Sequence, residues 1–74
     1  MNENELSFNN FVDNYINGNL SYCQKEVYKF DLIDLRQHFI DYAGYSLEKS
    51  IYIIDYLTTG KNYQLACDTD WLLV

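Results

Sequence analysis

Residues 31–44, DLIDLRQHFIDYAG, carry the clearest structural signal of this sequence. Apolar side chains recur there every three or four positions, the spacing that places them along one side of an α-helix. These apolar positions are Leu32, Leu35, Phe39 and Ala43. Asp31 can cap the first turn, because its carboxylate accepts hydrogen bonds from free backbone amides. Gly44 can end the helix in a left-handed conformation, so the stretch predicts a helix between Asp31 and Gly44.

The segments on either side follow the same rules. A helical apolar spacing from about Glu5 to Asn17 stops before Gly18. After Gly44, Ser46 can cap a helix that continues to Thr58-Thr59 and stops at Gly60. Because only two or three residues join this helix to the one before it, we expect the two to form a helical hairpin or a sharply angled pair.

Two segments are ambiguous. Ser21 and Gln24 have the spacing of a capping box, which favours a helix, but the alternation over residues 26–30 also fits a short strand. Residues Lys61–Val74 have the pattern of extended structure, with a possible small hairpin. We therefore predict one mainly α domain over residues 1–74, with three to four helices and a short extended or β-hairpin C-terminal segment. An α+β fold is the alternative.

The charge balance narrows the range of functions. Five Lys and Arg against 11 Asp and Glu leave a net charge of −6, whereas a nucleic-acid binder needs a basic stripe. An apolar content of 49% predicts a folded chain. No apolar run approaches a membrane span and no signal peptide is present, so we expect a cytoplasmic protein. Cys23 and Cys67 have no metal-site spacing and are predicted to be buried free thiols, a single disulfide being the alternative.

No catalytic motif is present in the sequence. Asp34 and His38 lie four positions apart and could share a metal ion, but no third ligand completes a site. We therefore place His38 on a solvated polar face next to acids. The three isolated glycines form neither a P-loop nor a dinucleotide fingerprint, and no nucleophile elbow exists. We expect no enzyme activity, no cofactor and no metal.

Acidic side chains recur along the two best-defined helices. They are Asp31, Asp34, Asp41, Glu48 and Asp55. At 1.5 Å per residue their spacing is of the same order as that of phosphates along a DNA strand. If the two helices align these faces, the carboxylates form a row that resembles duplex phosphates and can bind a basic protein groove. The alternative is that the acids only keep the protein in solution.

Eight tyrosines are more than so small a core can hide. Tyr45 lies in the turn between the two helices, and Tyr52 and Tyr56 lie one helical turn apart. We expect these three to face outward as anchors for a protein partner, because tyrosine is enriched at interface hot spots. The alternative is that they pack at the edge of the core.

In size, acidity and aromatic content the chain is similar to small inhibitors encoded by phages and mobile elements, including anti-restriction and anti-CRISPR proteins. That likeness implies a non-enzymatic inhibitor that binds a basic, nucleic-acid-handling host protein and does not bind nucleic acid itself. One alternative is a regulatory or structural module that forms homodimers through its tyrosines and the apolar residues Trp71-Leu72-Leu73-Val74. Another is an immunity protein that neutralises a basic toxin.

Overall fold

The computed structural model describes residues 3–68, which form helices and no strand. The helices are α1 (Glu3–Ile16), α2 (Leu20–Glu26), the short 3-10 helix η1 (Val27–Lys29), α3 (Leu32–Ala43), α4 (Leu47–Thr59) and α5 (Tyr63–Asp68). None of them is long and apolar enough to cross a membrane. The prediction of a small, mainly α fold is confirmed.

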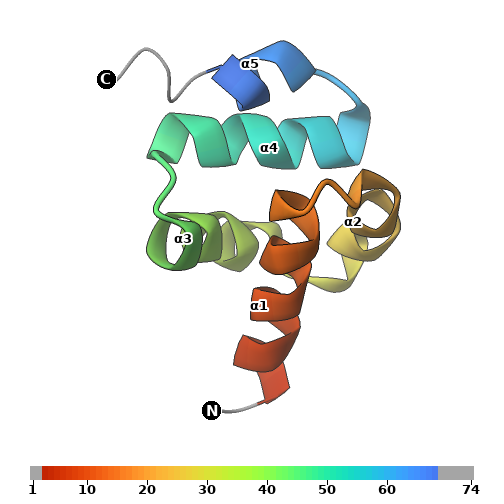
Figure 1. Ribbon diagram of the computed structural model, residues 1–74, viewed down its shortest axis with the longest axis vertical. Coiled ribbons are helices and arrows are strands. Elements are labelled where there is room, and N and C mark those ends of the chain that lie inside the picture. The colour runs from red at the N-terminus through yellow and green to blue at the C-terminus, as the bar shows by residue number, and fades with distance from the viewer. Residues whose placement is uncertain (1–2, 69–74) are drawn as a thin grey trace.

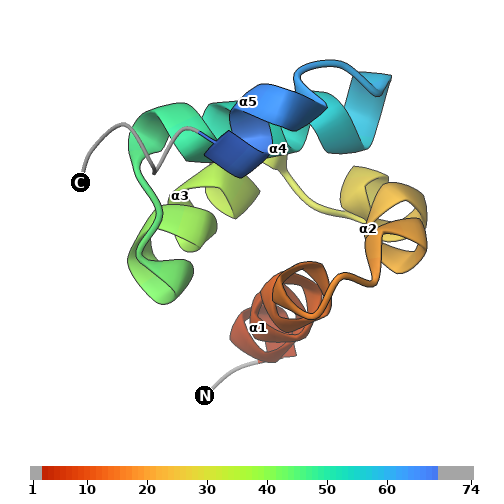
Figure 2. The same ribbon diagram turned by 45° about the horizontal axis from the view of Figure 1, so that its top comes forward.

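Helix α4 lies at the centre of the arrangement (Figures 1 and 2). It packs against α5 on one side and against α3, α2 and η1 on the other. Helix α1 contacts α2 and α3, and its N-terminal half extends away from α4 (Figure 1).

The core takes side chains from every element. Its fully or almost fully buried apolar members are Phe11, Val12, Cys23, Val27, Leu35, Phe39, Ile53, Ile54, Leu57 and Ala66. Phe39 lies at the centre, with edge-on contacts to Phe11 at 6.2 Å and to Tyr15 at 5.4 Å between ring centroids. Such aromatic contacts add to the free energy gained by burial. A small core of this kind depends strongly on its few large rings.

The predicted ends of α3 and α4 are confirmed. The Asp31 carboxylate accepts hydrogen bonds from the amides of Ile33 and Asp34, and the Ser46 hydroxyl accepts one from the amide of Lys49. Gly44 and Gly60 end these helices with φ of 77° and 76°. Only glycine adopts this left-handed conformation without steric cost.

The helix alternative for residues 21–30 is correct, but the predicted capping box is not. Helix α2 begins at Leu20 after Asn19, two residues before the start that a Ser21 cap would give, and the Asn19 side chain instead donates to Asn14 Oδ1 at 3.0 Å. The segment then tightens into η1. With α5, the described part of the chain has five α-helices, more than the three to four that were predicted.

The C-terminal prediction is wrong up to Asp68. Residues Tyr63–Asp68 form helix α5, because Ala66 is buried against the core and Tyr63 packs on Tyr56 with 4.8 Å between the rings. Tyr63 and Ala66 lie three positions apart, which is the spacing of one face of a helix. A run of only a few apolar residues does not by itself distinguish a helix from a strand. Asp68, the first residue of the turn expected at residues 68–70, ends α5, and the rest of that turn and the apolar segment at residues 71–74 lie outside the described residues.

Both cysteines are free, as predicted. Cys23 is fully buried, and its Sγ lies 3.7 Å from the carbonyl oxygen of Phe11. Burial raises the pKa of this thiol to about 11, because the thiolate would lose its hydration. Cys67 is only half-buried, which differs from the expectation for this residue.

Candidate functional site

A groove opens between α1, α2, η1 and the start of α3. Its volume is about 580 Å³, and we call it the acidic groove. Its lining residues are Ser7, Phe8, Asn10, Tyr22, Glu26, Lys29, Phe30, Asp31 and Asp34. The lining residues come from α1, α2, η1 and the start of α3, and none comes from α4.

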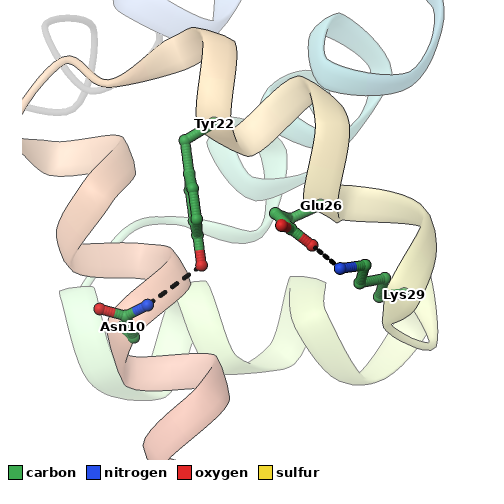
Figure 3. A network of polar contacts seen from close by, with 4 residues as sticks. All are labelled: Asn10, Tyr22, Glu26 and Lys29. Carbon is green, nitrogen blue, oxygen red and sulfur yellow. Dashed lines mark hydrogen bonds and ion pairs between the residues drawn. The ribbon is translucent and has the colours of Figure 1, made fainter.

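Aromatic rings form part of the wall of the acidic groove. The rings of Phe8 and Phe30 lie 5.0 Å apart, and Phe30 also packs edge-on against the buried Phe11 at 5.2 Å. Tyr22 extends from α2 toward α1, where its hydroxyl accepts a hydrogen bond of 3.0 Å from Asn10 Nδ2 (Figure 3). The rings are therefore held in place by the core and by a bond between α1 and α2.

Charged groups surround these rings. Glu26 and Lys29 form an ion pair at 2.6 Å (Figure 3), and this hydrogen bond together with the carboxylate charge raises the pKa of Lys29. Asp31 and Asp34 are exposed at the start of α3. The lining of the groove thus contains three carboxylates and one ammonium group, which gives it a net negative charge.

Asp31 has a structural role and an exposed charge at the same time. Its Oδ1 accepts hydrogen bonds from the amides of Ile33 at 3.0 Å and Asp34 at 3.2 Å. Within residues 3–68, its Oδ2 has no hydrogen bond, so it can accept one from another molecule. A carboxylate that is already held by backbone amides loses little side-chain freedom when it binds a cation.

His38 does not lie on a solvated face, which corrects the expectation from the sequence. Its ring is half-buried between the rings of Phe8, at 5.1 Å, and Tyr42, at 5.3 Å. Its Nε2 lies 2.6 Å from Asn9 Oδ1 of α1. Phe8 belongs both to this stack and to the wall of the acidic groove, so His38 helps to hold α1 against α3 beside it.

A further carboxylate extends the acidic surface along α1. The Tyr42 hydroxyl donates to Asp13 Oδ1 at 3.2 Å, and the Asp13 charge raises the pKa of Tyr42. Asp41, next to Tyr42 in the sequence, accepts a hydrogen bond from Gln37 at 3.0 Å. Both acids are exposed and neither forms an ion pair within the described part of the chain.

The five acids predicted as a binding row do not form one row. Asp31 and Asp34 line the acidic groove, whereas Asp55 lines a separate groove between α3 and α4. Asp55 is half-buried and accepts a hydrogen bond from Asn62 Nδ2 at 3.2 Å. The two helices cross so that their acidic sides face different directions, which the spacing along each helix could not reveal.

The tyrosines expected to face outward do not do so. Tyr45, Tyr52 and Tyr56 are half-buried and pack against the core. Tyr45 stacks on Phe39 at 6.1 Å, and the almost buried Lys49 lies with its Nζ 4.8 Å from the Tyr45 ring centroid. The exposed tyrosines are instead Tyr28, Tyr42 and Tyr63.

Several residues of the candidate site could not be recognised from the sequence. Glu26 lies in a segment whose secondary structure was ambiguous, and Asp13 lies on the most polar of the expected helices. Both approach α3 only through tertiary packing. The aromatic residues of the groove wall can be recognised in the sequence as apolar. Their partial exposure to solvent cannot be recognised there.

Among the side chains of residues 6–67, no three His, Cys, Asp or Glu lie close enough together to hold a metal ion. Comparisons with protein-family models, with curated proteins and with solved structures gave no match.

Proposed function

We propose that this protein is a non-enzymatic inhibitor that binds the basic, nucleic-acid-binding surface of a host protein in the cytoplasm. The observation that carries the proposal is the acidic groove, in which Glu26, Asp31 and Asp34 surround a wall of aromatic rings. Arginine suits such a groove, because its planar guanidinium stacks on aromatic rings and binds carboxylates through two parallel hydrogen bonds. Basic nucleic-acid-binding surfaces are rich in arginine and lysine.

Acids outside the groove support the same proposal. Asp34 and Asp41 lie two helical turns apart on α3, about 10.5 Å along its axis, with Asp13 nearby on α1. Such exposed charges steer a basic protein during diffusional encounter and occupy sites that would otherwise hold phosphates. The protein then acts as a DNA mimic of the anti-restriction or anti-CRISPR kind, a class found in phages and mobile elements.

The proposal is tested by neutralising one acid inside the groove and one outside it. Asp34→Asn and Glu48→Gln each remove one negative charge from an exposed position, but only Asp34 lines the acidic groove. The probe is a peptide of nine arginines, with binding measured by calorimetry at low and at physiological salt. Loss of a charged hydrogen bond costs about 1.5–3 kcal/mol, so Asp34→Asn should weaken binding at least tenfold. Glu48→Gln should change it less than about twofold.

A second arm asks whether the bound surface is one that binds nucleic acid. Proteins captured from a host lysate by the immobilised chain should be released by duplex DNA, and Asp34→Asn should capture less of them than Glu48→Gln. The proposal is overturned if the two variants bind the peptide equally, or if duplex DNA leaves the captured proteins in place. Release by DNA also distinguishes this function from neutralisation of a basic toxin whose active surface does not bind nucleic acid.

A further inference from the structure

A second groove lies between α3 and α4 on a different side of α3. Its volume is about 100 Å³, and we call it the α3–α4 groove. Its lining residues are Leu32, Ile33 and Arg36 from α3 and Ile51, Ile54 and Asp55 from α4. Asp34 of the acidic groove and Arg36 of this groove are about 160° apart around the helix, so the two grooves open in different directions.

The α3–α4 groove is mainly apolar and reaches the surface. Ile33 is 65% exposed and Leu32 is 37% exposed, although both lie on a well-packed helix. Both line the groove together with Ile54, which is buried. Adjacent exposed apolar side chains that are flanked by charges are typical of protein–protein interaction sites.

The two charged residues of this groove are complementary and lie on opposite walls. Arg36 belongs to α3 and Asp55 to α4, yet the two form no ion pair with each other. Within the described residues Arg36 has no hydrogen bond and no ion pair, and Asp55 has no cationic partner. A half-buried guanidinium next to apolar side chains favours a carboxylate partner.

We propose that the α3–α4 groove is the interface of a two-fold symmetric homodimer. In such an interface the same surface meets itself, so each contact occurs twice. A two-fold axis along the groove exchanges its walls, which brings Arg36 opposite Asp55 of the second copy and Asp55 opposite Arg36 of the second copy. Leu32 and Ile33 of one copy then pack against Ile51 of the other. The groove is neutral, so a second copy suits it better than the basic partner of the acidic groove.

This dimer is independent of the proposed inhibitory function. The acidic groove does not share a lining residue with the α3–α4 groove. Each copy of the dimer therefore keeps its acidic groove open, and the assembly presents two of them. Two linked sites raise the apparent affinity for a partner that offers two basic surfaces.

The test measures the dissociation constant of the full chain by sedimentation equilibrium up to about 100 µM, a range suited to a small interface. The wild type should dimerise, and Ile33→Lys should weaken the dimer at least tenfold while its circular dichroism spectrum stays unchanged, because this side chain is mostly exposed. Arg36→Asp and Asp55→Arg should each weaken it, and the double variant should recover to within about threefold of the wild type. Glu48→Arg, an equal charge change on α4 outside the groove, is the matched control.

Three results would overturn the proposal. The first is a wild type that stays monomeric at all these concentrations. The second is a dimer that is unaffected by Ile33→Lys or not restored by the double exchange of charges. The third concerns Trp71, the only tryptophan of the chain: if Ile33→Lys shifts its fluorescence in a monomeric sample, the chain's own C-terminal segment occupies the groove.

Discussion

At the scale of single residues, burial in the core determines the acidity of the Cys23 thiol. The thiol is fully buried in the core, and the absence of hydration raises its pKa to about 11. Burial also raises the pKa of Tyr15. Both groups stay protonated in the folded chain at a pH where the unfolded chain begins to lose these protons.

Stability should therefore fall in alkaline solution. Above the ordinary thiol pKa of 9.0, the unfolded chain releases the Cys23 proton while the folded chain keeps it up to about pH 11. The unfolded state then binds fewer protons, so the free energy of unfolding decreases as the pH rises through this range. Urea denaturation at several pH values measures the slope. Cys23→Ala should flatten it, and an unchanged slope in this variant would show that the thiol does not contribute.

At the scale of the helices, Asp31 links the structure of α3 to the charge of the acidic groove. Its Oδ1 caps the helix through two backbone amides, and its carboxylate lines the groove. The cap was evident from the sequence, because a capping residue acts within its own first turn. The groove was not, because Glu26 and Phe8 reach Asp31 only when α1 and α2 pack beside it.

Two substitutions separate these roles of Asp31. Asp31→Ala removes both the cap and the charge and should lower the free energy of unfolding by about 1 kcal/mol. Asp31→Asn keeps an oxygen acceptor for the amides, so it should stay within a few tenths of a kcal/mol of the wild type. Thermal or urea denaturation gives the stabilities. Binding of the nine-arginine peptide should fall in both variants, and a loss confined to Asp31→Ala would assign the effect to the helix end instead of the charge.

At the scale of the whole molecule, stability rests on a few buried rings shared between helices. Phe39 of α3 contacts Phe11 and Tyr15 of α1 and Tyr45 of the loop before α4. A chain of 74 residues has a core that supplies only about 3–5 kcal/mol of net stability. The loss of one central ring therefore threatens the complete fold.

Phe39→Ala should leave the chain largely unfolded at room temperature. Truncation of a buried phenylalanine costs about 3–5 kcal/mol, which equals the expected stability of so small a domain. Circular dichroism should show the loss of helix. Phe39→Leu, which retains most of the apolar volume, should stay folded, and a cooperative native-like transition in Phe39→Ala would contradict the central role of this ring.

The sequence by itself determined the helical class of the fold and the ends of α3 and α4. These features depend on side-chain spacing and on capping within a few residues, which are local effects. Only the tertiary structure decided which acids share a surface, which tyrosines pack against the core, that the cysteines are free, and that His38 lies between Phe8 and Tyr42. Helix crossing directions depend on packing between residues far apart in the chain, so no local pattern contains them.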